Sequence, residues 1–128
     1  MNEIPELIQK RLIDTNHVEH AAIFRRQDSS LRVASLGFNL SSDDITYLVS
    51  LFEDLPRCRE DGVIFGGVTY RAIRADKFSI YLVNKRDGLV LVKTKTLIIF
   101  TTWNNTQYAS VCIESAENLG SYFKEKGK

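Results

Sequence analysis

Apolar and polar residues divide the chain into a helical start, an alternating middle and a helical end. Near the start, Ile4, Leu7, Ile8 and Leu12 recur at three- and four-residue spacing, which predicts an amphipathic helix that stops near Thr15. The same spacing near the end predicts a long final helix after residue 106. Its apolar stripe comprises Tyr108, Val111, Cys112, Ser115, Ala116, Leu119, Tyr122 and Phe123.

Two strands and a second helix are expected next. Residues 21–26 and 31–35 read as strands joined by a Gln-Asp-Ser-Ser turn. Ser-Ser-Asp-Asp at 41–44 predicts a helix start, because the hydroxyl groups cap free N–H groups and the carboxylates favour the positive end of the helix dipole. Pro56 marks the exit from this helix, and residues 57–61 form a loop or a short helix.

From residue 62 the hydrophobic period switches to two, which predicts a meander of five strands. Gly66-Gly67 and the Asp87-Gly88 pair suit the positive backbone angles of tight hairpins. The strands are expected at residues 63–65, 68–74, 79–85, 89–93 and 97–102. An antiparallel sheet of this size must cover its apolar faces, so the terminal helices should pack on it. The chain is thus expected to be a single α+β domain over residues 1–128.

Composition argues against several classes of function. The 128 residues carry a formal net charge of +1, so a nucleic-acid binder with a strongly basic domain is not indicated. No apolar run suits a signal peptide or a membrane span. In such a chain Cys58 and Cys112 are expected to be free thiols rather than a disulfide. The prediction is a reduced, cytoplasmic domain.

Catalytic chemistry is not indicated. His17 and His20 have no cysteine or carboxylate at metal-ligand spacing. The sequence shows no nucleophile with histidine and acid partners in a motif, and no phosphate-binding glycine loop. We therefore expect no enzyme activity, no metal and no cofactor.

Five short motifs occur in a consistent order across nearly the whole chain. They are Val-Glu-His-Ala-Ala-Ile at 18–23, Phe-Gly-Gly at 65–67, Phe-Ser at 78–79, Lys-Thr at 93–94 and Leu-Gly-Ser-Tyr-Phe at 119–123. Together they resemble the profilins. Segments 33–39, 74–76 and 92–94 are more similar to a divergent vertebrate branch of that family than to its ubiquitous isoforms. The resemblance implies a central antiparallel sheet with the N- and C-terminal helices on one face and shorter helices on the other.

Profilins bind proline-rich segments in a groove paved with aromatic rings, which stack on proline and bond its carbonyl groups. Of the matching positions here, only Tyr122 keeps its ring and hydroxyl, whereas Phe123 replaces an aliphatic residue. One tyrosine does not make such a groove, so we expect proline-rich binding to be weak or lost. The remnant positions are Ile8, Val33, Tyr122 and Phe123, with Pro5 and Lys128 beside them.

Profilins also bind monomeric actin, and the resemblance implies a weakened actin face. Thr69 and Val83 stand where Lys and Arg are common, and Glu114 and Glu117 add negative charge to the last helix. Actin is acidic, so this exchange lowers the rate of association. The actin-binding residues implied are Tyr70, Arg74, Lys85, Trp103 and Tyr108.

Phosphoinositide binding requires a less exact arrangement of residues, because clustered basic side chains each contribute about 1 kcal/mol at an anionic surface. Adjacent strands of the meander are expected to bring several such side chains together on one face. The phosphoinositide-binding candidates are Arg71, Arg74, Lys85, Arg86, Lys93, Lys95, Lys124 and Lys126.

Simpler interpretations stay open for the same residues. Lys124 and Lys126 complement the negative end of a helix, and Lys85-Arg86 suits a solvated hairpin tip. Trp103 is either a core residue or an interface anchor. Tyr122 and Phe123 are either packing residues or a ligand shelf.

The function expected is that of a small cytoskeletal regulator, monomeric and cytoskeleton-associated, that binds actin monomers reversibly in competition with anionic lipid. One alternative is a phosphoinositide-surface protein that no longer binds actin. Another is a general interaction module with a similar helix-and-sheet build, because fold alone does not decide function.

Overall fold

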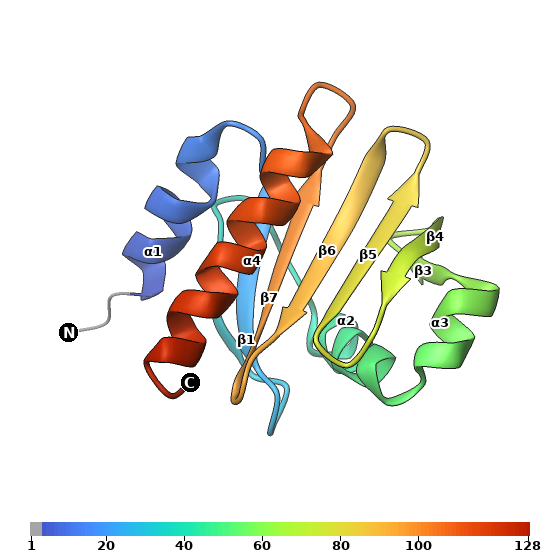
Figure 1. Cartoon of the computed structure of the whole chain (residues 1–128), viewed down its shortest axis with the longest axis horizontal. Coiled ribbons are helices and arrows are strands. Elements are labelled where there is room, and N and C mark those ends of the chain that lie inside the picture. Colours follow the sequence, from blue (N-terminus) through green and yellow to red (C-terminus); the bar gives the residue numbers. More distant parts are fainter. Residues whose placement is uncertain (1–3) are drawn as a thin grey trace.

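The computed structural model describes residues 4–128, whose seven strands form one sheet in the order β2-β1-β7-β6-β5-β4-β3 (Figure 1). Every paired strand is antiparallel to its neighbour. The predicted order of helix, two strands, helix, five strands and helix is confirmed. The elements, with η for a 3-10 helix, are α1 (Ile4–Arg11), η1 (Ile13–Thr15), β1 (His20–Arg25), β2 (Leu31–Ala34), α2 (Ser42–Ser50), η2 (Leu51–Glu53), α3 (Leu55–Asp61), β3 (Val63–Phe65), β4 (Val68–Ala75), β5 (Ser79–Asn84), β6 (Asp87–Lys93), β7 (Leu97–Trp103) and α4 (Ala109–Glu125).

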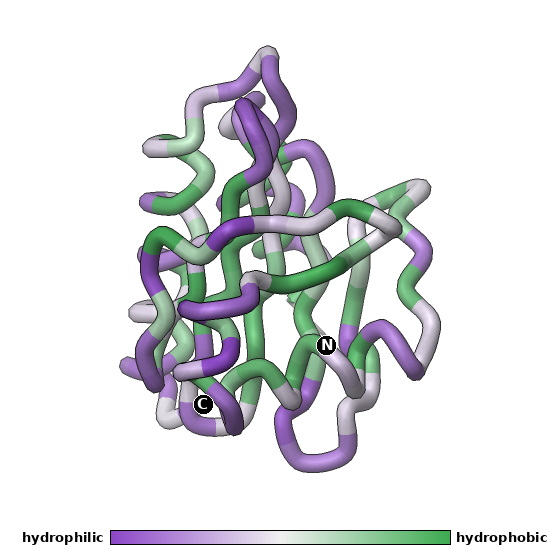
Figure 2. Tube along the Cα trace, turned by 90° about the vertical axis from the view of Figure 1, so that its right-hand side faces the viewer, coloured by the Kyte–Doolittle hydropathy of each residue, from purple (hydrophilic) through white to green (hydrophobic). Residues whose placement is uncertain are grey.

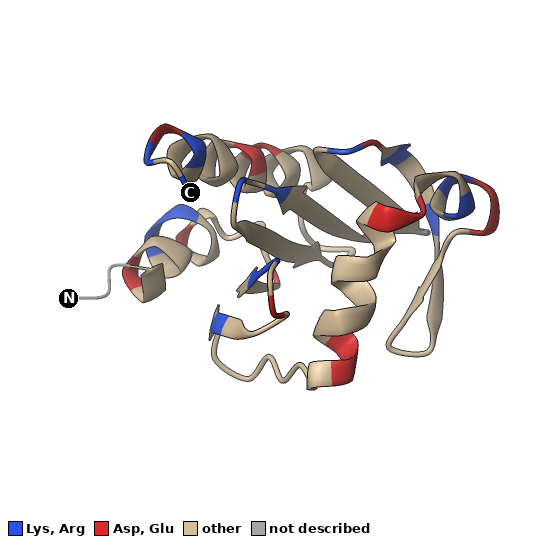
Figure 3. Ribbon diagram, turned by 90° about the horizontal axis from the view of Figure 1, so that it is seen from below, with Lys and Arg blue, Asp and Glu red and all other residues tan. Residues whose placement is uncertain are grey.

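Helices cover both faces of the sheet. Figure 1 shows α1 and α4 side by side in front of it, and Figure 3 shows α2 on the opposite side. Two buried clusters follow from this arrangement. One joins α1 and α4 to the sheet through residues such as Ile8, Ala116 and Phe123. The other joins α2 and α3 to the opposite face through residues such as Leu48 and Cys58. The predicted sandwich is confirmed.

The central strand β6 supplies apolar side chains to both clusters. Val90 and Val92 lie in the cluster beneath α4, whereas Leu89 and Leu91 lie in the cluster of α2. Because successive side chains of a strand point to opposite faces, a strand between two helix layers must be apolar at every position. Figure 2 shows the corresponding continuous apolar segments inside the molecule, with hydrophilic residues concentrated at turns.

Gly120 allows α4 to approach the sheet closely. A Cβ atom at this position would lie 2.7 Å from Cγ1 of Val92, which is closer than side chains normally pack. Leu119 and Phe123 are buried on either side of it. Close packing of α4 on the sheet therefore explains the glycine of the C-terminal Leu-Gly motif.

The predicted start of α2 is confirmed as a capping box. The Ser41 hydroxyl accepts from the N–H of Asp44 at 3.0 Å, and the Asp44 carboxylate accepts from the N–H of Ser41 at 3.0 Å. The predicted role of Pro56 is wrong. α2 already ends at Ser50, and Pro56 lies in the first turn of α3, where a missing N–H costs no helical hydrogen bond.

The two predicted hairpin turns have different outcomes. Gly66 and Gly67 have φ of 59° and 77° and form the β3–β4 turn as expected. In the β5–β6 hairpin, however, Asn84 pairs with Asp87, so the turn consists of Lys85 and Arg86. Lys85 adopts the positive φ of 55° that the Asp-Gly pair was expected to supply.

Gly88 lies inside β6, where Trp103 occupies the space that a side chain would need. The two residues pair across β6 and β7, and a Cβ on Gly88 would lie 2.1 Å from the indole ring. Trp103 is 4 % exposed, which decides between the two alternatives in favour of a core residue.

This packing predicts that Gly88→Ala lowers the free energy of unfolding by about 1–3 kcal/mol, because the indole ring must move. In a Trp103→Leu background the same change should cost less, since the smaller side chain leaves room. Urea unfolding followed by far-UV circular dichroism measures both costs. Additive effects of the two substitutions would contradict this interpretation.

Candidate functional site

A polar network lies between α4 and the adjoining face of β4 and β5. Arg74 on β4 is paired in register with Tyr81 on β5. Tyr81 packs against the cluster beneath α4, which places both side chains on the α4 side of the sheet. Glu117, half-buried on α4, reaches the same point.

Arg74 contacts two carboxylates and a phenol. Its Nε donates to Oδ2 of Asp76 at 2.8 Å, and its Nη1 donates to the Tyr81 hydroxyl at 2.9 Å. The same Nη1 lies 3.7 Å from Oε2 of Glu117. That oxygen also accepts from the Tyr81 hydroxyl and, at 2.7 Å, from the hydroxyl of Ser79.

The network shifts the pKa values of its members. Burial and then the hydrogen bond to Glu117 raise the pKa of Tyr81 to about 12. Burial opposes ionisation of Asp76, but hydrogen bonds from Arg74 and from the backbone N–H groups of Phe78 and Ser79 outweigh it and lower its pKa to about 2. The hydrogen bond to Asp76 raises the pKa of Arg74. Arg74 and Asp76 are therefore held as an ion pair.

The positive charge of Arg74 is thus offset by two neighbouring carboxylates. The sequence pattern indicated Arg74 as a basic group for a partner, but it did not identify Asp76 and Glu117 as contacts of Arg74, or Ser79 as a contact of Glu117. Strand alternation carried part of the signal, since positions 79 and 81 share a face. The position of Glu117 needs the packing of α4 on the sheet.

The remaining residues implied for actin lie in different environments. Lys85 is exposed at the tip of the β5–β6 hairpin. Tyr108, 68 % exposed, stacks on His17 with 4.9 Å between ring centroids, and its N–H donates to Nδ1 of His17 at 2.9 Å. Tyr70 is half-buried against the cluster of α2 and α3, and the buried Trp103 offers almost no surface.

The basic candidates for phosphoinositides do not converge on one face, which corrects that expectation. Arg71 and Lys85 line one cleft of about 330 Å³, with Arg86 beside Lys85 in the hairpin turn. Lys93, at the other end of β6, lies about 20 Å away along the strand, because each residue advances about 3.3 Å. A third group, Lys124 and Lys126, lies at the end of α4.

The remnant of the proline-binding groove is largely covered. Ile8 and Phe123 are buried core residues, and Val33 is half-buried against the same cluster. The half-buried Tyr122 ring has the Arg11 guanidinium 4.7 Å from its centroid, and the Lys126 ammonium at 5.5 Å. The ring of Tyr122 therefore lies near the surface, and two cationic side chains lie over it.

Two absences concern residues 4–128 only. No helix there has the length and hydropathy needed to cross a bilayer. In the same part of the chain, His, Cys, Asp and Glu side chains form no group of three that could hold a metal ion.

The sequence and the fold both match one family. The profilin family model matches residues 2–128. The chain belongs to the profilin family. Profilin-4 of Bos taurus is 37 % identical over 128 residues and Profilin-4 of Mus musculus is 35 % identical, and each alignment covers 99 % of both chains. The predicted likeness to the divergent vertebrate branch is confirmed.

Solved profilin structures have the same fold. Schizosaccharomyces pombe profilin superposes with a TM-score of 0.85 at 32 % identity, covering 94 % of this chain and 96 % of that one. Acanthamoeba castellanii profilin IA gives 0.86 at 28 % identity, covering 96 % and 98 %. Profilins are non-enzymatic proteins that bind actin and regulate the cytoskeleton, which supports the expectation that this chain is not an enzyme.

The low pKa of Asp76 predicts acid sensitivity. Its folded pKa of about 2 lies below the ordinary 3.8, so its contribution to stability is complete above pH 3.8 and is lost as the pH falls toward 2. Because the side chains are 42 % exposed, solvent screening reduces this contribution to about 1 kcal/mol. Asp76→Asn should flatten the fall in unfolding free energy between pH 4 and pH 2 by about that amount.

Urea unfolding at a series of pH values measures this slope. Glu60→Gln is the matched control, because Glu60 is exposed and makes no hydrogen bond or ion pair among the described residues. Equal slopes for Asp76→Asn and the unmodified protein would show that the Arg74–Asp76 pair contributes nothing to stability.

Proposed function

We propose that this profilin is a cytoplasmic regulator of actin assembly that binds actin monomers reversibly through α4 and the adjoining strands β4, β5 and β6. Family membership carries the proposal, since profilins bind actin. Exposed groups of the kind that form interfaces also lie on β4, in the β5–β6 turn and at the start of α4, namely Arg71, Lys85 and Tyr108.

Actin binding is proposed to be weakened by charge. Arg74 is paired with Asp76 and Glu117, so it adds little net positive potential toward an acidic partner. Glu114 is exposed on α4 and adds a further negative charge. The surface keeps its shape while losing part of its electrostatic steering.

Anionic lipid is proposed to compete for the same surface. Arg59, Arg71 and Lys85 line the cleft of about 330 Å³ at the end of the sheet. Glu60 and Asp61 also line it and reduce its positive potential. A phosphorylated headgroup bound at Arg71 and Lys85 would occupy part of the surface proposed for actin.

The second candidate is a phosphoinositide-surface protein that has given up actin. The pairing of Arg74 with Glu117 favours it, because a cation engaged within the protein is costly to redirect toward a partner. Both candidates share the profilin fold, so only binding measurements separate them.

Titration of purified actin monomers tests the leading proposal. Complex formation should weaken about fivefold or more for Lys85→Glu, and should strengthen several-fold for Glu114→Lys, because both changes alter the charge facing acidic actin. Sedimentation equilibrium and the rate of spontaneous polymerisation report binding and its consequence.

Matched charge reversals away from this surface provide the controls. Lys10→Glu on α1 and Glu125→Lys at the far end of α4 change the net charge equally and should leave binding nearly unchanged. If neither the unmodified protein nor Glu114→Lys binds actin at tens of micromolar, the second candidate replaces the first.

A peptide of consecutive prolines should show no saturable binding below about 1 mM, because Arg11 and Lys126 cover the ring of Tyr122 and the neighbouring ring of Phe123 is buried. Calorimetric titration measures this. Arg11→Ala should improve binding by uncovering the ring, whereas Arg57→Ala on α3 should not. Micromolar affinity in the unmodified protein would contradict the prediction.

A further inference from the structure

A pocket of about 220 Å³ lies on the α2 side of the sheet, at the end where β1 and β6 begin and β7 ends. Its lining comes from the ends of these three strands, from the β2–α2 connection and from the β3–β4 hairpin. Phe38, Phe65, Tyr70 and Leu89 of this lining belong to the cluster of α2 and α3 or pack against it. The pocket is therefore on the face opposite the Arg74 network, which lies on the α4 side.

Three half-buried aromatic rings line this pocket. Phe38 comes from the β2–α2 connection, and Phe65 and Tyr70 come from the β3–β4 hairpin. Phe38 and Phe65 both pack on the buried Phe100, with 5.8 Å and 5.3 Å between ring centroids. The ring of His20, which also lines the pocket, stacks on Phe38 at 4.8 Å. One core ring thus fixes two aromatic walls that come from distant segments.

The only charged side chains that line the pocket, among the described residues, are the carboxylates of Glu19 and Asp87. Neither forms an ion pair within residues 4–128. Glu19 is held in place, because its carboxylate accepts from the hydroxyl of Thr102 and from the side-chain amide of Asn104, each at 3.3 Å. Burial, and then the negative charges of Asp87 and Glu19, raise the pKa of Tyr70. Both carboxylates therefore act on the aromatic part of the lining.

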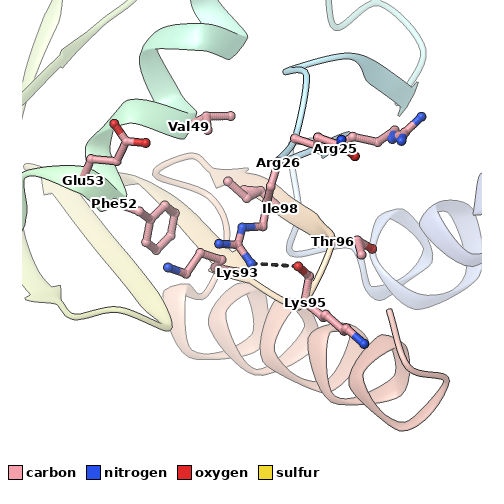
Figure 4. A pocket seen from close by; sticks show the side chains of 10 residues that line it. Arg25, Arg26, Val49, Phe52, Glu53, Lys93, Lys95, Thr96 and Ile98 are labelled. Carbon is pink, nitrogen blue, oxygen red and sulfur yellow. Dashed lines mark hydrogen bonds between the residues drawn. The ribbon is translucent and has the colours of Figure 1, made fainter.

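The opposite end of the same face carries positive charge instead. Figure 4 shows Arg25, Arg26, Lys93 and Lys95 around a cleft of about 410 Å³ there, and Glu53 is its one lining carboxylate among the described residues. Negative charge beside aromatic rings is thus particular to the pocket of Phe38 and Phe65, and the α2 side as a whole does not share it.

Aromatic rings beside unpaired carboxylates suit an organic cation. An alkylated ammonium spreads its charge over methyl groups, which are attracted to aromatic rings, whereas a bare ammonium is strongly hydrated. An inorganic cation is not favoured, since His, Cys, Asp and Glu of residues 4–128 form no group of three that could hold a metal ion. The volume is below the range of about 300–1,000 Å³ typical of whole ligands, so the pocket suits a head group.

We propose that this pocket binds an alkylated ammonium group, either that of a small free molecule or that of a methylated lysine side chain. The proposal goes beyond actin binding and does not rest on it. Tyr70 is also among the residues that the family resemblance implies for actin, so Glu19 and Phe38, which are outside that set, carry the tests. Residues 85–86 of the β5–β6 turn are basic but do not line the pocket.

Titration of the full chain with choline, followed by ¹H–¹⁵N NMR, tests the pocket. The backbone amides of His20, Gly66 and Gly88, which all line it, should shift on binding. The neutral isostere 3,3-dimethylbutanol has nearly the same shape without the charge, and should bind at least about fivefold more weakly.

Two substitutions separate the charge from the ring. Glu19→Gln should weaken choline binding at least about threefold, because it removes one opposite charge. Glu125→Gln on α4 is its matched control and should leave the affinity unchanged. Phe38→Leu keeps an apolar side chain but removes the ring, and should also weaken binding at least about threefold. Phe78→Leu, at a half-exposed ring outside the pocket, is the control for this change.

A peptide with one trimethyllysine between glycine and serine residues identifies the source of the ammonium. Tighter binding of this peptide than of choline, with loss in the unmethylated peptide, assigns a methylated lysine side chain. Affinity for choline equal to or above that for the peptide assigns a small free molecule. The proposal would be overturned by absence of amide shifts with either probe, by equal affinity for choline and its neutral isostere, or by equal losses in Glu19→Gln and Glu125→Gln. Actin titration of Glu19→Gln should match the unmodified protein, so failure here is distinct from failure of the actin proposal.

Discussion

Burial of both faces of the central strands is the constraint on which the rest of this structure depends. All seven residues of β7 are buried, and β6 supplies side chains to the layers on both sides. The polar residues of these strands are small and hydrogen-bonded. The Cys112 thiol, for example, donates to the Thr101 hydroxyl at 3.4 Å. Charged groups are consequently excluded from the middle of the sheet and collect at its ends, its outer strands and its helix surfaces.

The two faces of the sheet differ in how they use these charges. On the α4 side of β4 and β5, Arg74 is paired with carboxylates, which offset its positive charge. At the β6–β7 turn, Arg26 and Lys93 lie together without such partners among the described residues. Local electrostatics, rather than the overall charge of +1, therefore distinguishes the surfaces of this profilin.

Local signals predicted most of the fold. The capping box at Ser41 and the Gly66-Gly67 turn depend on neighbouring residues, and both are confirmed. The prediction of a turn at Asp87-Gly88 was wrong: Asp87 and Gly88 lie in β6, and Gly88 leaves room for a distant residue, Trp103. For the site, sequence identified Arg74 and Lys85 as basic positions but not the partners of Arg74. Asp76 lies in the turn that follows β4, whereas Tyr81 comes from β5 and Glu117 from α4.

The sequence by itself determined the order of the elements, the family and the apolar character of the central strands, because each depends on spacing along the chain. Tertiary structure alone decided which charges distant in sequence meet. Arg74 and Glu117 are 43 positions apart, and Arg26 and Lys93 are 67 apart, yet each pair belongs to one cluster. Whether a basic side chain is paired with a carboxylate or left unpaired depends on the helix and the turn that pack beside it. The spacing of residues along the chain does not show which distant segments come together.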